Sequence, residues 1–194
     1  MDQALLPSAD LSNINTTRVG WFWEYTFNVV KYCNTVISRI DNIEWGKKED
    51  RNHILGTAFF HRAYRYYRAV HQFGNAPFLD EELTEPKTDF YSSDRWSILE
   101  RLYSDMEFAY KWVRAETERG KVNKDACGVL LMKICMSLGK FDRAIEIGNE
   151  IVANHPLMTE RFTSNKSKPR TNLMHDLHSV EAKLDMNNTE GIFY

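Results

Sequence analysis

The sequence has few of the residues that interrupt regular backbone structure. Among its 194 residues are nine glycines and five prolines, together about 7% of the chain where about 12% is usual. Such a shortage of turn-forming residues favours long, uninterrupted helices over many short strands.

Cysteine, long apolar runs and an N-terminal targeting pattern are also scarce or missing. The three cysteines, Cys33, Cys127 and Cys135, each lie in an apolar helical pattern, where a thiol packs as a small hydrophobe. We therefore expect core cysteines without a redox or metal role. No run approaches the ~18 consecutive apolar residues of a membrane span, and residues 1–13 lack the basic and apolar blocks of a signal peptide. Taken alone, these absences predict a soluble, cytosolic chain.

An excess of charge of one sign is missing as well. The 25 Lys and Arg residues against 27 Asp and Glu residues give a formal net charge of −2, so a nucleic-acid backbone would meet no overall attraction. The content of 43% apolar and 13% aromatic residues excludes disorder throughout, because disordered chains lack the side chains that offset ordering entropy.

What the sequence does contain is helical periodicity. Apolar residues recur at steps of three and four within residues 21–156, which predicts amphipathic helices. The predicted helices cover residues 21–40 and 49–73, a third that begins at Ser97, a fourth capped by Asn123, and a fifth over 141–154. Ser97 and Glu100 have the spacing of a capping box, and Asn123 is a residue type favoured at helix starts.

The two ends of the chain differ from this helical middle. Residues 1–20 are polar and unpatterned, and we expect an irregular segment there. Residues 157–194 predict a loop, a short helix within 175–186 and the start of a strand at 191–194. A strand needs a partner for its backbone donors and acceptors, so this ending predicts a chain that continues into a further, mixed C-terminal part.

A repeat pattern predicts how the helices associate. The order helix, glycine, aromatic, helix, proline in residues 125–156 is typical of the 34-residue tetratricopeptide unit. With Pro156 as the closing proline, four residues fall on expected positions, namely Leu131, Gly139, Phe141 and Ala144, whereas Met132, Gly148 and Ile151 do not. A generic helical hairpin is the alternative. We predict an all-α fold for residues 21–156, with tetratricopeptide-like pairs forming a right-handed superhelix.

Motifs of catalysis and of metal binding are missing. The sequence has no HExxH, P-loop, GxSxG or dinucleotide GxGxxG motif. His175 and His178 are a close pair without a third ligand nearby, and we expect them to be exposed. Residues 185–191 alternate like calcium ligands, but the turn glycine comes one place late, which favours a polar loop. We predict no catalytic residue, no bound metal and no cofactor.

Arg62 and the aromatic residues are the remaining candidates for a role. Arg62 lies on the apolar stripe of the second predicted helix, where a guanidinium needs a carboxylate or carbonyl partner, so we expect a structural ion pair. Aromatic rings with a polar tip can stack on sugars, but rings at helical spacing usually fill a core. We therefore expect core positions for four rings, Trp23, Phe27, Phe59 and Tyr66. Trp21 lies off that stripe and is the candidate ligand-binding residue.

Five segments in order along residues 21–194 carry a resemblance to a known family. The first has anchors at Trp23, Phe27, Val30 and Asn34; the others are HRAYRYYRAVHQFGNAPF, DRWSILERLYSDMEFAYKWV, GKVNKDACGVLLMKICMSLGKFDRAIEIGNEIV and NNTEGIFY. Together they resemble the SusD/RagB family of outer-membrane nutrient-binding lipoproteins of Bacteroidetes. In that family's helices an arginine stands at the position of Arg62 and an aspartate at that of Asp105.

The resemblance implies a function. Members of the family have a helical scaffold of tetratricopeptide-like pairs that packs against a TonB-dependent transporter, and a more variable part that binds a nutrient, commonly a glycan, without catalysis. A lipid anchor holds them on the external face of the outer membrane. Neither the acylated cysteine nor the long C-terminal half of the family is found in this sequence, so we expect a fragment, and no binding residue transfers by motif. The alternative is a soluble tetratricopeptide-type scaffold that binds a protein or peptide in a groove.

Overall fold

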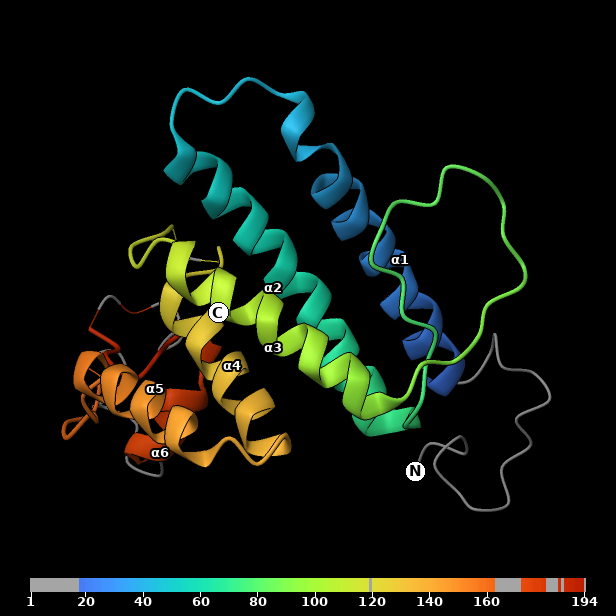
Figure 1. Ribbon diagram of the computed structural model, residues 1–194. Coiled ribbons are helices and arrows are strands. Elements are labelled where there is room, and N and C mark those ends of the chain that lie inside the picture. Colours follow the sequence, from blue (N-terminus) through green and yellow to red (C-terminus); the bar gives the residue numbers. More distant parts are fainter. Residues whose placement is uncertain (1–17, 119, 163–171, 181–184, 186, 194) are drawn as a thin grey trace, which may run out of the picture. The chain divides into compact units, whose positions relative to one another are not determined.

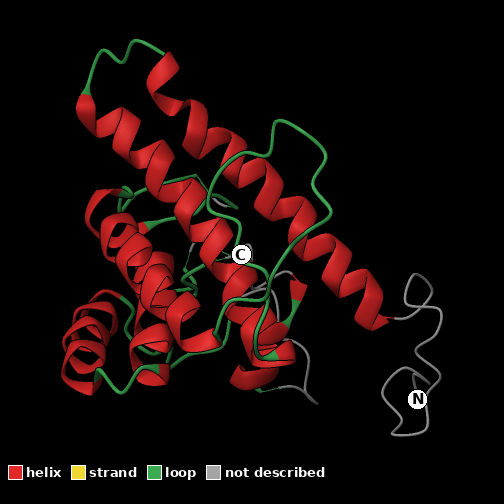
Figure 2. Cartoon of the chain, turned by 45° about the vertical axis from the view of Figure 1, so that its right-hand side comes forward, coloured by secondary structure: helices red, strands yellow, loops and turns green. Residues whose placement is uncertain are grey.

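The computed structural model describes residues 18–118, 120–162, 172–180, 185 and 187–193, and these are helices joined by loops (Figure 1). In this described part of the chain there is no strand (Figure 2), and an isolated antiparallel bridge joins Ala76 to Ser93. The predicted all-α class is confirmed. No helix among the described residues combines the length and the apolar character that crossing a membrane requires.

The chain divides into two compact units, residues 1–112 and residues 113–194. This boundary lies inside the range 21–156, for which the sequence predicts one helical domain, and that domain assignment stays a prediction. Helices pack in pairs within each unit, α1 with α2 and α4 with α5. The right-handed superhelix also stays a prediction.

The described residues of unit 1 form three long helices and one short 3-10 turn: α1 (Arg18–Arg39), η3 (Ile40–Asn42), α2 (Lys48–Phe73) and α3 (Arg95–Trp112). Helix α2 packs against both α1 and α3. It ends where Gly74 adopts a φ of +79° and donates its backbone N–H to the Val70 carbonyl at 3.0 Å. Glycine suits this position because side chains disfavour a positive φ. The predicted end of α2 is confirmed, and the other boundaries predicted for α1 and α2 differ from the observed ones by one to three residues.

The predicted start of α3 is wrong in detail. Helix α3 begins at Arg95, two residues before Ser97, and the carboxylate of Asp94 accepts the backbone N–H groups of Trp96 at 2.9 Å and Ser97 at 3.2 Å. Asp94 therefore caps the helix and Ser97 lies in its first turn. Asp94 thus takes the capping position that we predicted for Ser97, and the capping box predicted for Ser97 and Glu100 is wrong.

Unit 2 contains α4 (Lys124–Ser137), α5 (Phe141–Asn154) and the short α6 (Leu173–His178). The prediction of Asn123 as the α4 cap is confirmed, because its Oδ1 accepts the Ala126 N–H at 2.7 Å. Gly139, with a φ of +73°, ends the turn after α4. Where α4 and α5 pack, a Cβ on Gly148 would lie 3.3 Å from the Met132 sulfur, so the small residue permits a close approach.

The end of the chain differs from its prediction. Helix α6 begins two residues before the range 175–186, because the Asn172 side chain accepts the His175 N–H at 2.9 Å and caps it there. Residues 181–184 and 186 lie outside the described residues. Residues 191–193 are not in a strand, and the Ile192 carbonyl instead accepts a hydrogen bond from the Asn123 side chain at 2.8 Å.

Candidate functional site

The loop between α2 and α3 covers residues 75–94, and its first half is hydrogen-bonded to side chains of α1 and α2. Three buried side chains hold its backbone: Asn34 Nδ2 donates to the carbonyls of Leu79 at 2.9 Å and Glu81 at 3.0 Å, Arg62 donates to the Asp80 carbonyl at 2.9 Å, and the Tyr66 hydroxyl accepts the Leu79 N–H at 2.7 Å. These bonds satisfy backbone N–H and C=O groups that have no partner in a strand or a helix. The loop therefore has a defined course without regular secondary structure.

Arg62 is the centre of this arrangement. Its guanidinium is fully buried and donates to Asp105 Oδ2 at 2.6 Å and to Asn34 Oδ1 at 2.9 Å, in addition to the Asp80 carbonyl. Burial raises the pKa of the Asp105 carboxyl, and the nearby Arg62 charge opposes that rise. The predicted structural ion pair is confirmed, and Arg62 has both the carboxylate and the carbonyl partner that its position requires.

Tyr66 contributes to the same cluster as a neutral hydroxyl. Burial raises its pKa to about 12 although the Leu79 N–H donated to it lowers that pKa. The ring packs edge-on against Phe27, with 6.2 Å between centroids, and also contacts Phe78 at 4.8 Å. Tyr66 thereby links the packing of α1 and α2 to the loop, and its predicted core position is confirmed.

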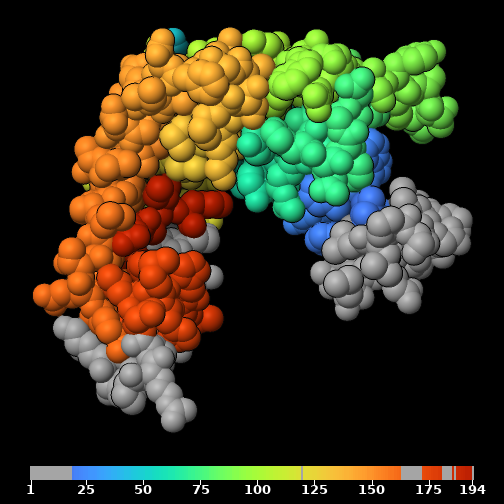
Figure 3. All heavy atoms as spheres, turned by 90° about the horizontal axis from the view of Figure 1, so that it is seen from below, coloured from blue at the N-terminus to red at the C-terminus, as the bar shows by residue number. Residues whose placement is uncertain are grey.

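The second half of the loop turns away from the helices and leaves a cleft beside α1. Residues 83–92 are exposed, and Figure 3 shows the loop's green spheres as a projection at one edge of unit 1. Between this part of the loop and α1 lies a cleft of about 650 Å³, which we call the loop cleft. Ligand pockets in proteins commonly have volumes of about 300–1,000 Å³.

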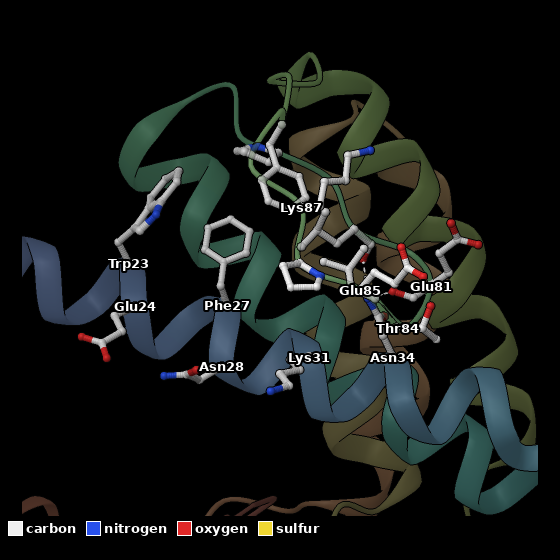
Figure 4. A pocket seen from close by; sticks show the side chains of 15 residues that line it. Trp23, Glu24, Phe27, Asn28, Lys31, Asn34, Glu81, Thr84, Glu85 and Lys87 are labelled. Carbon is white, nitrogen blue, oxygen red and sulfur yellow. Dashed lines mark hydrogen bonds between the residues drawn. The ribbon is translucent and has the colours of Figure 1, made fainter.

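The lining of the loop cleft combines apolar and polar side chains. Its apolar lining comes from aromatic, proline and leucine side chains, namely Trp23, Phe27, Pro77, Leu79, Leu83, Pro86 and Phe90. Its polar lining comes from Glu24, Asn28, Lys31, Asn34, Glu81, Thr84, Glu85 and Lys87. Figure 4 shows Trp23 and Phe27 rising from α1 toward the loop, whose residues Glu85 and Lys87 form part of the opposite wall.

This lining has a definite chemistry. Rings offer flat apolar surface, while carboxylates, amides, a hydroxyl and ammonium groups offer hydrogen bonds in both directions. A ligand with apolar faces and many hydroxyl groups matches both parts. Among the described residues, no group of three or more His, Cys, Asp or Glu side chains is arranged to hold a metal ion.

Two residues that we predicted to be core belong to this cleft. Trp23 and Phe27 are half-buried, and their rings contact one another at 4.8 Å between centroids while lining the cleft. Trp23 also packs edge-on against Phe73 at 5.0 Å. The two rings are therefore packed on one side and accessible on the other. On this side of α1 the neighbour is the loop, and a further helix in its place would bury both rings.

Trp21, the candidate ligand-binding residue, does not line the loop cleft. Its side chain is 60% exposed and stacks on Tyr25, with 5.2 Å between ring centroids and 6° between the planes. The residues that line the cleft from the loop, such as Thr84, Lys87 and Phe90, had no signal in the sequence. Two further predictions are confirmed: Cys33, Cys127 and Cys135 are buried, and His175 and His178 are exposed. Phe59, which we predicted to be core, is half-buried.

Comparison with known proteins identifies the family. Residues 5–134 match the SusD-like family described as starch-binding and associating with the outer membrane, and the chain belongs to this family. A curated relative, SusD-like protein P25 of Formosa agariphila, is 26% identical over 152 residues, which are 76% of this chain and 29% of that protein.

Solved structures share the fold. A SusD-like carbohydrate-binding protein from Bacteroides vulgatus superposes with a TM-score of 0.63 at 20% identity, over 77% of this chain and 35% of that protein. A laminarin-binding SusD-like protein gives a TM-score of 0.64 at 17% identity, over 72% of this chain and 31% of that protein. This chain thus spans about a third of the length of the proteins it matches.

Proposed function

We propose that this chain is the helical part of a protein that captures glycans at the external face of the outer membrane, hands them to a TonB-dependent transporter and carries out no catalysis. Membership of the SusD-like family supports the proposal, since the family is described as starch-binding and associating with the outer membrane. A laminarin-binding protein and a carbohydrate-binding protein of the same fold support it further. Family membership also disfavours a stand-alone peptide-binding scaffold.

The observation that carries the proposal is the lining of the loop cleft. Trp23, Phe27 and Phe90 provide ring surface on which a sugar can stack, and the polar side chains of the lining provide hydrogen-bond donors and acceptors for its hydroxyl groups. Capture of this kind needs no acid, base or nucleophile at defined spacing. We further propose that Trp21 is a ligand contact outside the loop cleft, because its ring is 60% exposed.

The test is calorimetric titration of the chain with neutral malto-, laminari- and xylogluco-oligosaccharides. We compare wild type with Phe90→Ala, which removes an exposed ring from the cleft, and with Tyr91→Ala. Tyr91 is the neighbouring residue, is 85% exposed and does not line the cleft, so it is a matched control. Loss of a stacking ring is expected to weaken binding by about tenfold.

The outcomes separate the proposal from its alternatives. Binding of at least one oligosaccharide, reduced in Phe90→Ala and unchanged in Tyr91→Ala, is the expected result. Absence of binding to every oligosaccharide, or equal loss in both variants, would overturn the loop cleft as the site. The transporter part is tested separately, by co-purification with the TonB-dependent transporter encoded beside this gene, and a gene without such a neighbour would contradict it.

A further inference from the structure

A second cluster of aromatic residues on α1 and α2 lies apart from the loop cleft and contains two arginines. Trp21 stacks on Tyr25, and the Arg65 guanidinium lies over the Tyr25 ring, 4.3 Å from its centroid. The cluster continues through the ring of Tyr64, which lies 5.7 Å from Arg65 and 5.8 Å from Arg68. We call it the Arg–aromatic strip; its residues are Trp21, Phe22, Tyr25, Tyr64, Arg65 and Arg68.

The guanidinium groups of Arg65 and Arg68 each lie over an aromatic ring of α1. Arg65 lies over Tyr25 and Arg68 lies 4.8 Å from the centroid of Phe22. Within the described residues, neither has a carboxylate within ion-pair distance or a side-chain hydrogen bond. A guanidinium that lies over a ring still carries five N–H donors, which an anionic ligand can accept.

Helix α2 itself adds no negative charge near these arginines. The sequence between Arg51 and Leu79 contains no aspartate or glutamate, although it contains three arginines, Arg62, Arg65 and Arg68. Arg62 is neutralised by Asp105 in the core. Arg65 and Arg68 thus carry two positive charges without an ion pair among the described residues. They are placed three residues apart on α2, where side chains are neighbours about 5–6 Å apart at Cβ.

An anion fits the arginine end of the strip and a pyranose ring fits the tryptophan end. Guanidinium groups bind carboxylate and sulfate in a bidentate manner, and stacked arginines lose little side-chain freedom on binding. Trp21 has one face against Tyr25 and is 60% exposed, so its other face is accessible to a sugar. We propose that the strip binds acidic oligosaccharides, in which carboxylate or sulfate groups contact Arg65 and Arg68 while a sugar ring stacks on Trp21.

This inference rests on the proposed function, because it names the class of glycan. It differs from the loop cleft in the residues involved, since none of the six strip residues lines the cleft. The two surfaces can therefore be tested independently, the cleft with neutral sugars and the strip with acidic ones.

The test is a titration of the chain with oligogalacturonate, with the same oligomer as its methyl ester, with a sulfated galactan oligosaccharide and with a polyglutamate peptide. Oligogalacturonate and its ester share one backbone and differ in charge. We expect binding of the acidic sugars, at least tenfold weaker binding of the ester, and weakening of acidic-sugar binding by added salt. Comparison of the carboxylated and the sulfated sugar decides which anion is preferred.

The variants assign this binding to the strip. Arg65→Gln with Arg68→Gln should weaken binding of the acidic sugar by about tenfold or more for each arginine, and Trp21→Ala should weaken it while leaving the salt dependence. Arg95→Gln is the matched control, because Arg95 is exposed and lies over Trp96 at 4.5 Å elsewhere in unit 1. Arg68→Gln alone, at an exposed position, serves if the double variant does not fold.

Several results would overturn the inference. If the ester binds as tightly as the acid, the negative charge does not contribute to binding. If Arg95→Gln loses as much binding as the strip variants do, any surface arginine suffices. Polyglutamate binding as tightly as the acidic sugars would identify a surface for acidic protein segments. If neutral sugars bind in the loop cleft and acidic ones do not bind, the strip fails while the proposed function stands; if no sugar binds, both fail.

Discussion

Replacing Asp105 with alanine tests the cluster that positions the loop cleft. In the folded protein the Arg62 guanidinium is fully buried and its charge is neutralised by Asp105 at 2.6 Å. The variant leaves that guanidinium with its bonds to Asn34 and to the Asp80 carbonyl, neither of which carries a charge. A positive charge then remains in the interior without compensation.

The magnitude follows from this burial. Removing one partner of a buried ion pair costs about 3–5 kcal/mol, because the remaining charge has lost its water and its counter-charge. Arg101 also approaches Asp105, at 3.7 Å, but its side chain is 54% exposed and its contact is a minor contribution. The Arg62 Nε has no partner among the described residues, so the cluster has no spare acceptor to replace Asp105. The loss is a large share of the about 5–15 kcal/mol that stabilises a typical domain.

The assay is urea denaturation followed by tryptophan fluorescence. All five tryptophans lie within residues 1–112, so the signal reports on unit 1 alone. With a denaturant slope of about 2 kcal/mol per molar urea, Asp105→Ala should lower the midpoint by about 1.5–2.5 M. Asp105→Asn, which keeps an acceptor oxygen without the charge, should fall between Asp105→Ala and wild type.

The control is an aspartate in the same unit without such a role. Asp89 is exposed on the loop, and Asp89→Ala should change the free energy of unfolding by no more than about 0.5 kcal/mol. A loss of less than about 1 kcal/mol in Asp105→Ala would refute the reasoning, because it would mean that water or a local rearrangement solvates Arg62 in the variant.

Three further predictions concern the rest of the fold. Arg39 donates a hydrogen bond to the Glu82 carboxylate and thereby lowers its pKa. The contribution of this pair to stability is therefore present above the ordinary carboxyl pKa of 4.5 and is lost as the pH falls through the lowered pKa. In Glu82→Gln the free energy of unfolding should depend less on pH in this range, and an unchanged pH dependence would contradict the assignment. Burial raises the pKa of the Cys33 thiol to about 11, so a thiol-specific disulfide reagent at mildly alkaline pH should react with the cysteines only after unfolding, whereas rapid reaction of the native chain would show an open core. Asn123→Ala should lower the free energy of unfolding of unit 2 by about 1 kcal/mol through loss of the α4 cap, as measured by circular dichroism, with Asn123→Asp retaining most of it.

The helices could be predicted from the sequence because helical periodicity is a local property. The pattern of apolar steps gave α5 its observed limits, and the position of Arg62 on an apolar stripe indicated a buried ion pair. Arg62 was predictable because a charge among apolar neighbours has few stable solutions. The partner at Asp105, by contrast, lies on another helix and has no local signal.

The candidate site was harder to predict because a loop creates it. Asn34 and Arg62 donate to backbone carbonyls of residues 79–81, and the Tyr66 hydroxyl accepts the Leu79 N–H. These bonds set the course of the first half of the loop, and no periodicity encodes them. Trp23 and Phe27 have the spacing of core residues, and only the neighbouring loop decides that one side of each ring is accessible. Asn34, a buried polar residue on α1, was the signal that could have indicated a backbone partner nearby.

The most direct test of the central claim is a crystal structure of the chain with the neutral oligosaccharide that binds it most tightly. We expect sugar rings in the loop cleft, in contact with Trp23, Phe27 and Phe90 and hydrogen-bonded to the polar side chains that line it. An oligosaccharide ordered elsewhere on the chain while the cleft holds none would contradict it.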